Sequence, residues 1–213
     1  MGYSEYMNTK SVIVFVVATI VVLVGVVGLL WQFGGTTAST AKPIADVAGG
    51  MVHKQGDGPV VVTEFSDFQC PACQAVHVPL KQLLAKYPGK VTFVYRYFPL
   101  TNIHKNAMLS AEAAEAAGRQ GKFWEMGDLL FSKQTEWEGI ADPHPTFIQY
   151  AASLGLDQAK FAADLDSPVV RDAVTTDLTA ATRYNLQGTP TIFVNGVQTD
   201  FSNLDAAIIQ AAK

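Results

Sequence analysis

The stretch Phe65-Ser66-Asp67-Phe68-Gln69-Cys70-Pro71-Ala72-Cys73-Gln74 contains both cysteines of the chain, three residues apart. Before it, the β-branched run at 60–65 is typical of a buried strand, and after it residues 74–86 have a helical pattern. The pair therefore lies where a strand ends and a helix begins. Because the unpaired N–H groups at a helix N-terminus favour an anion, a thiol placed there is predicted to be reactive.

Around this junction the sequence predicts an α/β fold. A second β-rich run at 91–98 completes a βαβ unit, whose two strands should be parallel. Residues 103–184 have mainly helical signals and are interpreted as a helical insertion. Strand signals return at 191–194, where Asn195-Gly196 predicts a hairpin turn and a returning strand at 197–199. The expected plan is βαβ, helical insertion, ββα.

The N-terminal segment differs in composition from this domain. Residues 12–31 are uncharged and rich in Val, and as a helix of about 30 Å they would span a bilayer. Lys10 favours a cytoplasmic N-terminus, residues 1–11, and this predicts a single-pass protein of the cell membrane whose remaining chain is extracytoplasmic. A cleaved secretory signal is the alternative, and it would also export the chain.

Residues 32–58 are rich in Gly, Thr, Ser and Ala and predict a flexible linker between the membrane and the domain at 59–213. Within it, residues 44–52 carry a few apolar side chains that could dock on the edge of the domain. The sequence does not decide between these two interpretations.

Bulk properties narrow the class of function. The 213 residues carry a net charge of −4 and no basic run, which argues against nucleic acid as a partner. With only two cysteines, both in one motif, no disulfide framework joins distant segments. The fold must therefore be held together by packing.

The spacing of the two cysteines permits a disulfide that opens and closes. Residues three apart on a helix have Cβ atoms about 5–6 Å apart, and a small adjustment brings them to disulfide distance. Cys70, at the helix start, is predicted to exchange with the substrate, and Cys73 to resolve the mixed disulfide. Glu64 lies inside the apolar strand, so its pKa should rise, and it is predicted to relay protons to or from Cys73.

Other interpretations of these residues stay open at this point. A structural disulfide across so short a loop would stabilise the fold by only ~2 kcal/mol on the chain-entropy model. His77 could join the two cysteines in half of a zinc site, but there is no second Cys pair, and we interpret His77 as a solvated helix residue. The thiols could also be inert, and Glu64 could reach solvent at the edge of the sheet.

From residue 58 to the C-terminus, an ordered set of motifs resembles the DsbA-like thioredoxin-fold family of exported thiol–disulfide oxidoreductases, in particular its membrane-tethered bacterial members. The motifs are the stretch at 65–73 together with Tyr97-Phe98-Pro99-Leu100, His104-Lys105-Asn106-Ala107, Gly121-Lys122-Phe123-Trp124, Leu154-Gly155-Leu156-Asp157 and Gly188-Thr189-Pro190-Thr191. The resemblance implies a thioredoxin fold with a helical insertion.

The resemblance also implies roles for particular residues. Pro190 should be cis and lie against the cysteine pair, and Thr189 should offer its backbone to an extended substrate chain. The acid at Glu64 matches the family pattern, and His104 falls in a recurrent motif to which we attach no mechanism. Oxidising members often carry a His between the cysteines that stabilises the thiolate. Ala72 stands there instead and cannot donate, so a weaker oxidant is expected.

These observations predict a membrane-tethered extracytoplasmic thiol–disulfide oxidoreductase that forms disulfides in exported proteins through Cys70 and Cys73. Its expected partners are exported proteins with free cysteines and a membrane quinone-linked thiol oxidoreductase that reoxidises the pair. Neither a cofactor nor a metal ion is expected at the site. A disulfide reductase or isomerase and a non-catalytic tethered peptide-binding or chaperone module are the alternatives, and the sequence leaves the direction of electron flow open.

Overall fold

The computed structural model describes residues 18–20, 22, 46–49 and 52–213. The chain divides into two units, residues 1–40 and 41–213, and each is considered by itself. In the first unit, the described residues 18–20 and 22 are helical.

The predicted membrane anchor at 12–31 and the first part of the predicted linker lie mostly outside the described residues. Within the described ranges, no helix is both long and apolar enough to cross a bilayer. The anchor therefore stays a prediction.

The second unit is organised around one sheet. Its strands are β1 (His53–Gln55), β2 (Val60–Ser66), β3 (Val91–Tyr97), β4 (Thr191–Val194) and β5 (Val197–Thr199). They lie in the order β1-β3-β2-β4-β5, with β2 and β3 parallel and the other neighbouring pairs antiparallel. Helix α2 (Pro71–Leu84) connects β2 to β3, so the predicted parallel βαβ unit is confirmed.

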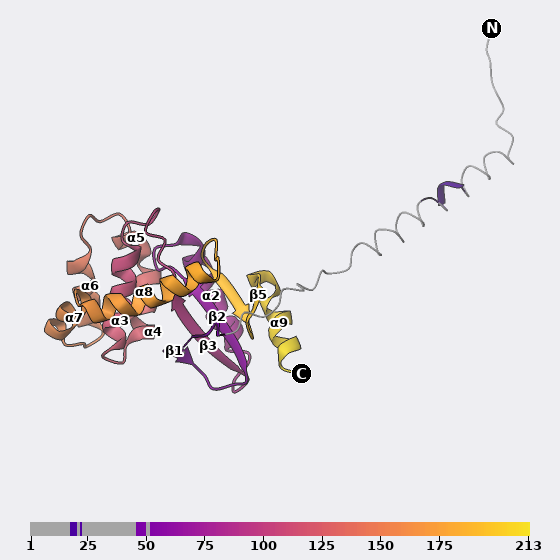
Figure 1. Ribbon diagram of the computed structural model, residues 1–213, viewed down its shortest axis with the longest axis horizontal. Coiled ribbons are helices and arrows are strands. Elements are labelled where there is room, and N and C mark those ends of the chain that lie inside the picture. Colours follow the sequence, from indigo (N-terminus) through magenta and orange to yellow (C-terminus); the bar gives the residue numbers. More distant parts are fainter. Residues whose placement is uncertain (1–17, 21, 23–45, 50–51) are drawn as a thin grey trace, which may run out of the picture. The chain divides into compact units, whose positions relative to one another are not determined.

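The segment between β3 and β4 is helical, as predicted. Its helices are α3 (Ala107–Gly118), α4 (Phe123–Ser132), α5 (Gln134–Trp137), α6 (His144–Ser153), α7 (Gln158–Leu165) and α8 (Pro168–Arg183). The first five gather in a lobe beside the sheet, and α8 runs from this lobe back to the sheet (Figure 1). Ser167 caps α8 by accepting a hydrogen bond from the N–H of Val170, and Pro168 occupies the first turn.

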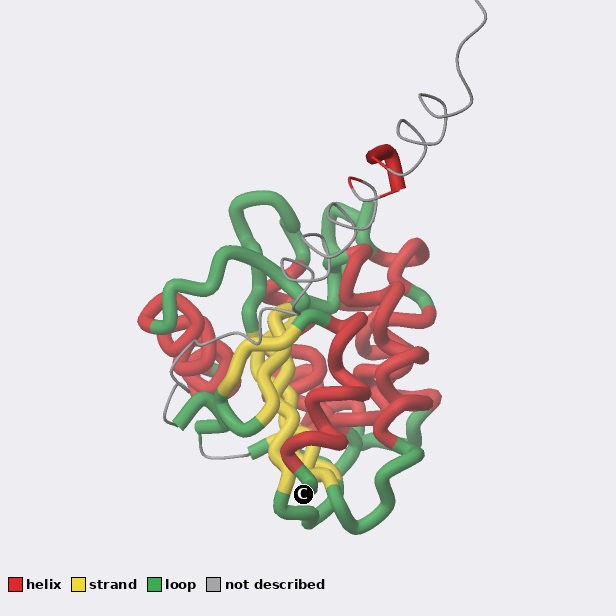
Figure 2. The backbone as a smooth tube through the Cα atoms, turned by 90° about the vertical axis from the view of Figure 1, so that its right-hand side faces the viewer, coloured by secondary structure: helices red, strands yellow, loops and turns green. Residues whose placement is uncertain are grey.

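Helices cover both faces of the sheet (Figure 2). Because side chains alternate along a strand, Val62 of β2 packs with α2 and with the C-terminal helix α9 (Leu204–Ala211). Phe65, on the opposite face of β2, packs with Ala181 of α8. Glu64 has the same parity as Val62, so its side chain lies on the face that α2 covers.

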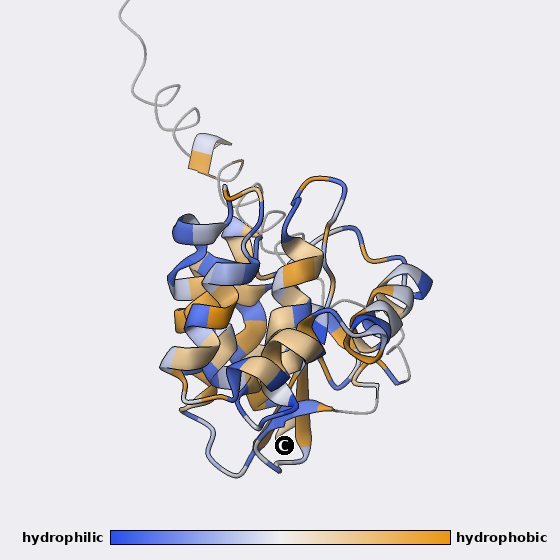
Figure 3. Ribbon diagram, turned by 90° about the vertical axis from the view of Figure 1, so that its left-hand side faces the viewer, coloured by the Kyte–Doolittle hydropathy of each residue, from blue (hydrophilic) through white to orange (hydrophobic). Residues whose placement is uncertain are grey.

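The core of the helical lobe continues without a break into the cysteine site. Trp137 and Phe147 in the lobe belong to the same buried cluster as Phe68 and Cys73. Figure 3 shows hydrophobic residues concentrated on the strands and on the helices around them, whereas many of the strongly hydrophilic stretches lie in loops. The lobe is therefore part of the packing that fixes the position of the cysteines.

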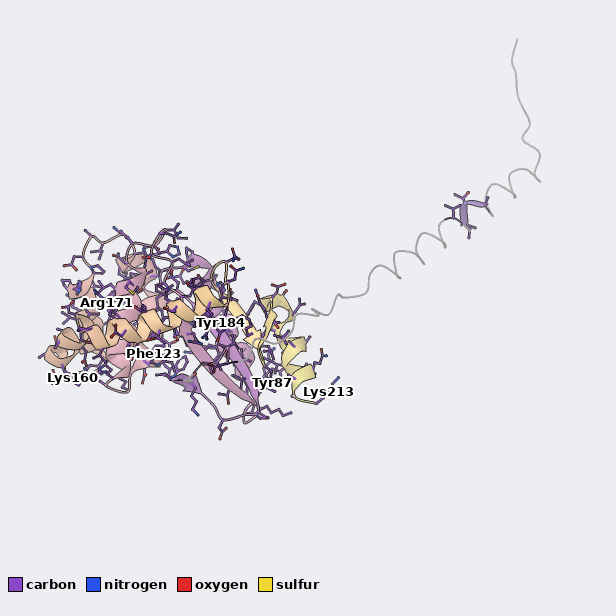
Figure 4. All side chains as sticks on the ribbon, viewed as in Figure 1. Tyr87, Phe123, Lys160, Arg171, Tyr184 and Lys213 are labelled. Carbon is purple, nitrogen blue, oxygen red and sulfur yellow. The ribbon has the colours of Figure 1, made fainter. Side chains whose placement is uncertain are left out.

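The end of the segment predicted to be a flexible linker is ordered, so the prediction for 32–58 is wrong for its described residues. Strand β1 pairs with β3, and Val47 is buried against Phe65. Two side chains labelled in Figure 4 hold this segment: Tyr184 donates a hydrogen bond to the carbonyl of Asp46 at 3.0 Å, and Phe123 stacks on His53 of β1.

This order comes from contacts with the rest of the domain and not from the segment's own pattern. His53-Lys54-Gln55 has no apolar alternation that would mark it as a strand, so composition alone indicated a linker. The docking of residues 46–49 agrees with the second interpretation of the apolar side chains at 44–52.

Candidate active site

The two cysteines lie at the junction of β2 and α2, as predicted. Cys70 is the N-cap residue of α2, with extended backbone angles, and Pro71 follows in the first turn. Both cysteines are free thiols. Cys70 retains 6% of its surface exposed and Cys73 none, so Cys70 is the thiol that an incoming group can reach.

The environment lowers the pKa of the Cys70 thiol from an ordinary value of 9.0 to about 5. A hydrogen bond with the Cys73 side chain is the largest cause, and burial opposes it. The backbone N–H groups of Cys73 and Ala72 lower the pKa further. Ala72 thus contributes through its backbone, and the expected weakening of the thiolate at this position is offset by the other donors.

Cys73 and Glu64 form the buried side of the site. Burial, hydrogen bonding with Cys70 and the nearby Glu64 carboxylate raise the pKa of Cys73 well above its usual range. Glu64 is 3% exposed, and burial raises its pKa to about 7, opposed by the Ser66 hydroxyl. The predicted rise in the pKa of Glu64 is confirmed. The sheet-edge alternative is wrong, because β2 lies between β3 and β4.

The loop before β4 closes the site on its open side. The Thr189–Pro190 peptide bond is cis, which agrees with the family resemblance. Cys70 Sγ lies 3.5 Å from the carbonyl oxygen of Thr189, to which the thiol donates. The structure therefore brings together four of the predicted site residues, Cys70, Cys73, Thr189 and Pro190, with Glu64 close enough to influence both thiols.

Sequence reasoning missed Asp67, a buried acid in the turn before Cys70. Its Oδ1 accepts the backbone N–H of Gln69 at 2.8 Å, and its Oδ2 accepts that of Leu100 at 3.0 Å. His104 Nδ1 lies 2.7 Å from the same Oδ2. This contact gives His104 a role, since it orients the acid that shapes the cysteine turn. The sequence signal that could have identified Asp67 is an acidic residue directly after an apolar strand.

Two amide side chains also fix the cysteine turn and were not predicted. Gln134 of α5 donates to the carbonyls of Phe68 and Cys70 at 2.8 and 3.2 Å. Gln69 accepts the backbone N–H of Asn106 at 2.7 Å. Both contacts join the turn to the helical lobe. No periodicity marks such residues, because their partners are distant in the sequence.

Replacing Asp67 by alanine is expected to lower the free energy of unfolding by about 2–3 kcal/mol, because two backbone N–H groups and His104 lose a charged acceptor. Urea unfolding measures this change. Asp57→Ala, which removes an exposed carboxylate from the same domain, is the control and should change stability by less than about 0.5 kcal/mol. Equal effects of the two substitutions would contradict the role given to Asp67.

The thiolate of Cys70 should titrate near pH 5, and its ultraviolet absorbance measures this directly. The pKa of Cys70 is lower in the folded than in the unfolded protein. Cys70 therefore stabilises the folded, reduced protein at pH values above the pKa of the thiol in the unfolded chain. This stabilisation is lost as the pH falls through about 5. In Cys70→Ser, where Cys73 alone remains, no thiolate should form in the neutral range. A Cys70 that titrates at an ordinary thiol pKa would contradict this description of the site.

His77 differs from its sequence interpretation as a solvated residue. Its Nε2 lies 2.8 Å from Asp128 Oδ1, its ring packs on Phe131, and its side chain is 19% exposed. In the described part of the chain, no three His, Cys, Asp or Glu side chains are grouped so that they could hold a metal ion.

Comparison with known proteins identifies the family to which this fold belongs. The family model described as Thioredoxin matches residues 48–210. The chain therefore belongs to the thioredoxin family.

Its fold is that of DsbA-like proteins. Oxidised BdbD from Bacillus subtilis is 24% identical, with a TM-score of 0.67 over 75% of this chain and 91% of that chain. A thioredoxin-like oxidoreductase from Silicibacter pomeroyi DSS-3 is 25% identical, with a TM-score of 0.65 over 79% and 97%. Alpha-DsbA1 from Wolbachia pipientis is 20% identical, with a TM-score of 0.63 over 74% and 91%.

Curated relatives share a limited part of their length with this chain. The Na(+)/H(+) antiporter NhaA 3 of Salinispora tropica is 41% identical over 146 residues, which cover 68% of this chain and 22% of that protein. NhaA 1 of Salinispora arenicola is 40% identical over 146 residues, with the same coverage of 68% and 22%. The chain thus spans about a fifth of the length of these relatives.

Proposed function

We propose that the chain is a thiol–disulfide oxidoreductase that transfers the Cys70–Cys73 disulfide to cysteines of other proteins. The observation that carries this proposal is the contrast between the two thiols. Cys70 retains a small exposed surface and has a pKa lowered to about 5, whereas Cys73 is fully buried and has a raised pKa. A low thiol pKa makes Cys70 a good leaving group from a mixed disulfide.

Protons and electrons balance in this exchange with the thiols of the substrate, the two cysteines and Glu64. A substrate thiolate attacks Cys70 Sγ, the Cys70–Cys73 bond breaks, and Cys73 leaves with the electron pair and takes a proton from Glu64. A second substrate thiolate then attacks the substrate sulfur of the mixed disulfide, and Cys70 leaves as a thiolate. The substrate gains one disulfide and the enzyme is reduced by two electrons. Thr189, beside the cis Pro190, holds the substrate backbone next to Cys70.

The pKa of Cys70 favours the oxidising direction over the reductase or isomerase alternative. A stabilised thiolate lowers the free energy of the reduced form, so the disulfide is a stronger oxidant. Ala72 was expected to weaken this effect, but hydrogen bonding from Cys73 is the largest cause of the lowered pKa.

The setting and partners of the reaction form part of the same proposal. The uncharged, Val-rich run at 12–31 supports a membrane anchor, with the catalytic domain outside the cytoplasm. Exported proteins with free cysteines would be the substrates. A membrane quinone-linked thiol oxidoreductase would reoxidise the pair, because the chain contains no cysteine other than these two.

The proposal is tested by trapping the mixed disulfide in cells that express the full-length chain. In Cys73→Ala, Cys70 can still form mixed disulfides by exchange with disulfides of exported proteins, and no second enzyme thiol can release them, so reducible adducts should accumulate. Cys70→Ser should form no such adducts, which makes it the matched control. Absence of adducts with Cys73→Ala, or equal adducts with both variants, would favour the non-catalytic binding module.

A further inference from the structure

A small cavity lies beside Glu64, between the sheet and helices α2 and α4. Its volume is about 30 Å³, enough for one or two water molecules. Glu64 and Tyr95 line it from the sheet, and Leu80 and Phe131 line it from the helices. Glu64 is therefore next to a space that both apolar and polar side chains line.

A surface groove lies on the other side of the same two helices. It has a volume of about 730 Å³ and is lined by residues of α2 and α4, including Gln74 and Glu125. Three polar residues line both the inner cavity and this groove: His77, Lys81 and Asp128. These side chains form the polar boundary between Glu64 and the solvent in the groove.

The three boundary residues are connected to one another. His77 Nε2 lies 2.8 Å from Asp128 Oδ1, and Lys81 Nζ lies 2.7 Å from Asp128 Oδ2. Burial lowers the pKa of His77, Asp128 opposes this change, and Lys81 adds to it. A neutral imidazole has one nitrogen that donates and one that accepts, so it can pass a proton between two neighbours.

An unsatisfied hydroxyl group lies near Glu64 on the inner side. The OH of Tyr95, which lines the cavity, is buried and has no hydrogen-bond partner among the described residues. Buried polar groups next to a space of this size favour ordered water, which makes hydrogen bonds to such groups. This observation is independent of the boundary residues and points to the same cavity.

We propose that His77, held by Asp128 and Lys81, is the solvent end of a proton route that reaches Glu64 through water in the cavity. The inference rests on the proposed function and assigns a positioning and relay role to a residue outside the cysteine motif. The titratable and charged groups that face this route come from three elements. Tyr95 lies on β3 and Asp128 lies on α4. The others lie on α2 or at its start: Cys70, Cys73 and Lys81.

The route completes the proton balance of the exchange. When the disulfide opens, Glu64 gives its proton to the Cys73 thiolate and becomes a buried carboxylate. It regains a proton from cavity water, His77 replaces that proton, and the solvent in the groove replaces the proton of His77. When the pair is reoxidised, the same steps run in reverse. Gln82 of α2 lines the groove but not the cavity and is exposed, so it provides a matched control.

The test measures the rate at which dithiothreitol reduces the Cys70–Cys73 disulfide of the full-length protein across the neutral pH range. His77→Phe should slow this reaction about 10-fold near neutral pH, less than the ~10²–10⁴-fold of a group that transfers a proton to the reacting atom itself, because His77 acts through Glu64. Its equilibrium with glutathione should stay within about 2-fold, because neither thiol is altered. Gln82→Leu should leave the rate unchanged. His77→Gln keeps a polar side chain without a proton that titrates, so it should also be slow.

A double substitution separates a proton route from a structural effect. If His77 acts through Glu64, adding His77→Phe to Glu64→Gln should slow the reaction no further than Glu64→Gln alone. A rate and pH profile of His77→Phe and His77→Gln equal to the wild type would overturn the route, as would an equal slowing by Gln82→Leu. The wild-type equilibrium with glutathione decides the proposed function separately, so failure of one inference is distinguishable from failure of the other.

Discussion

Replacing Cys70 by serine is expected to abolish disulfide transfer, with a loss of at least about 10³-fold, because a serine hydroxyl cannot form or exchange a disulfide. The fold should persist, since the side chain differs by one atom and most contacts of the turn come from Asp67, Gln69 and Gln134. The rate at which the oxidised protein forms a disulfide in a reduced two-cysteine peptide measures the effect.

Two comparisons make this result specific. Ser132→Ala removes a hydroxyl at the end of α4 that bonds only to the carbonyl of Leu129 in its own helix, and it should keep full activity. Cys73→Ser should also lose transfer, because it cannot form the internal disulfide that oxidises the peptide, but its Cys70 should still form a mixed disulfide when oxidised glutathione is added. Transfer by Cys70→Ser at more than a few per cent of the wild-type rate would contradict the role of Cys70.

Replacing Asp177 by alanine is expected to destabilise the domain by about 3–5 kcal/mol, the range for breaking a buried ion pair from one side. Asp177 Oδ1 lies 2.6 Å from Nη2 of Arg96, and its Oδ2 accepts the backbone N–H of Tyr97 at 3.0 Å. Arg96 is buried and also donates to the carbonyl of Val47 at 3.0 Å. Without the carboxylate, the guanidinium stays buried without its counterion, and the docked segment 46–49 loses support.

Denaturant unfolding of the reduced protein measures this change. Asp172→Ala provides the control, because it removes an exposed carboxylate from the same helix and should cost less than about 0.5 kcal/mol. If Asp177→Ala cost as little as Asp172→Ala, the ion pair with Arg96 would not hold α8 on the sheet.

The parts of the fold that follow local patterns could be predicted from the sequence. The β-branched runs at β2 and β3 and the turn at Asn195-Gly196 identified strands, and their order predicted the parallel pair. Strand β1 was missed because its three polar residues carry no alternation. Its place depends on pairing with β3 and on the stacking of His53 on Phe123.

In the candidate site too, local sequence patterns predict some residues, whereas others depend on contacts with distant parts of the chain. The positions of Cys70 and Cys73 follow from two local signals, the strand end and the helix start. Glu64 was recognisable as an acid within an apolar strand. Asp67, His104 and the boundary residue His77 act through partners far along the chain, so only the folded structure brings their contacts together. The amount by which the Cys70 pKa falls could not be predicted either, since it depends on the buried Cys73 as a donor.

The measurement that tests the proposed function most directly is the redox equilibrium of the Cys70–Cys73 pair against glutathione. With the pKa of Cys70 lowered to about 5, we expect an oxidising potential, between about −180 and −120 mV, in the range from disulfide isomerase to DsbA. A potential near about −270 mV, as in thioredoxin, would contradict a disulfide-forming role and favour the reductase alternative.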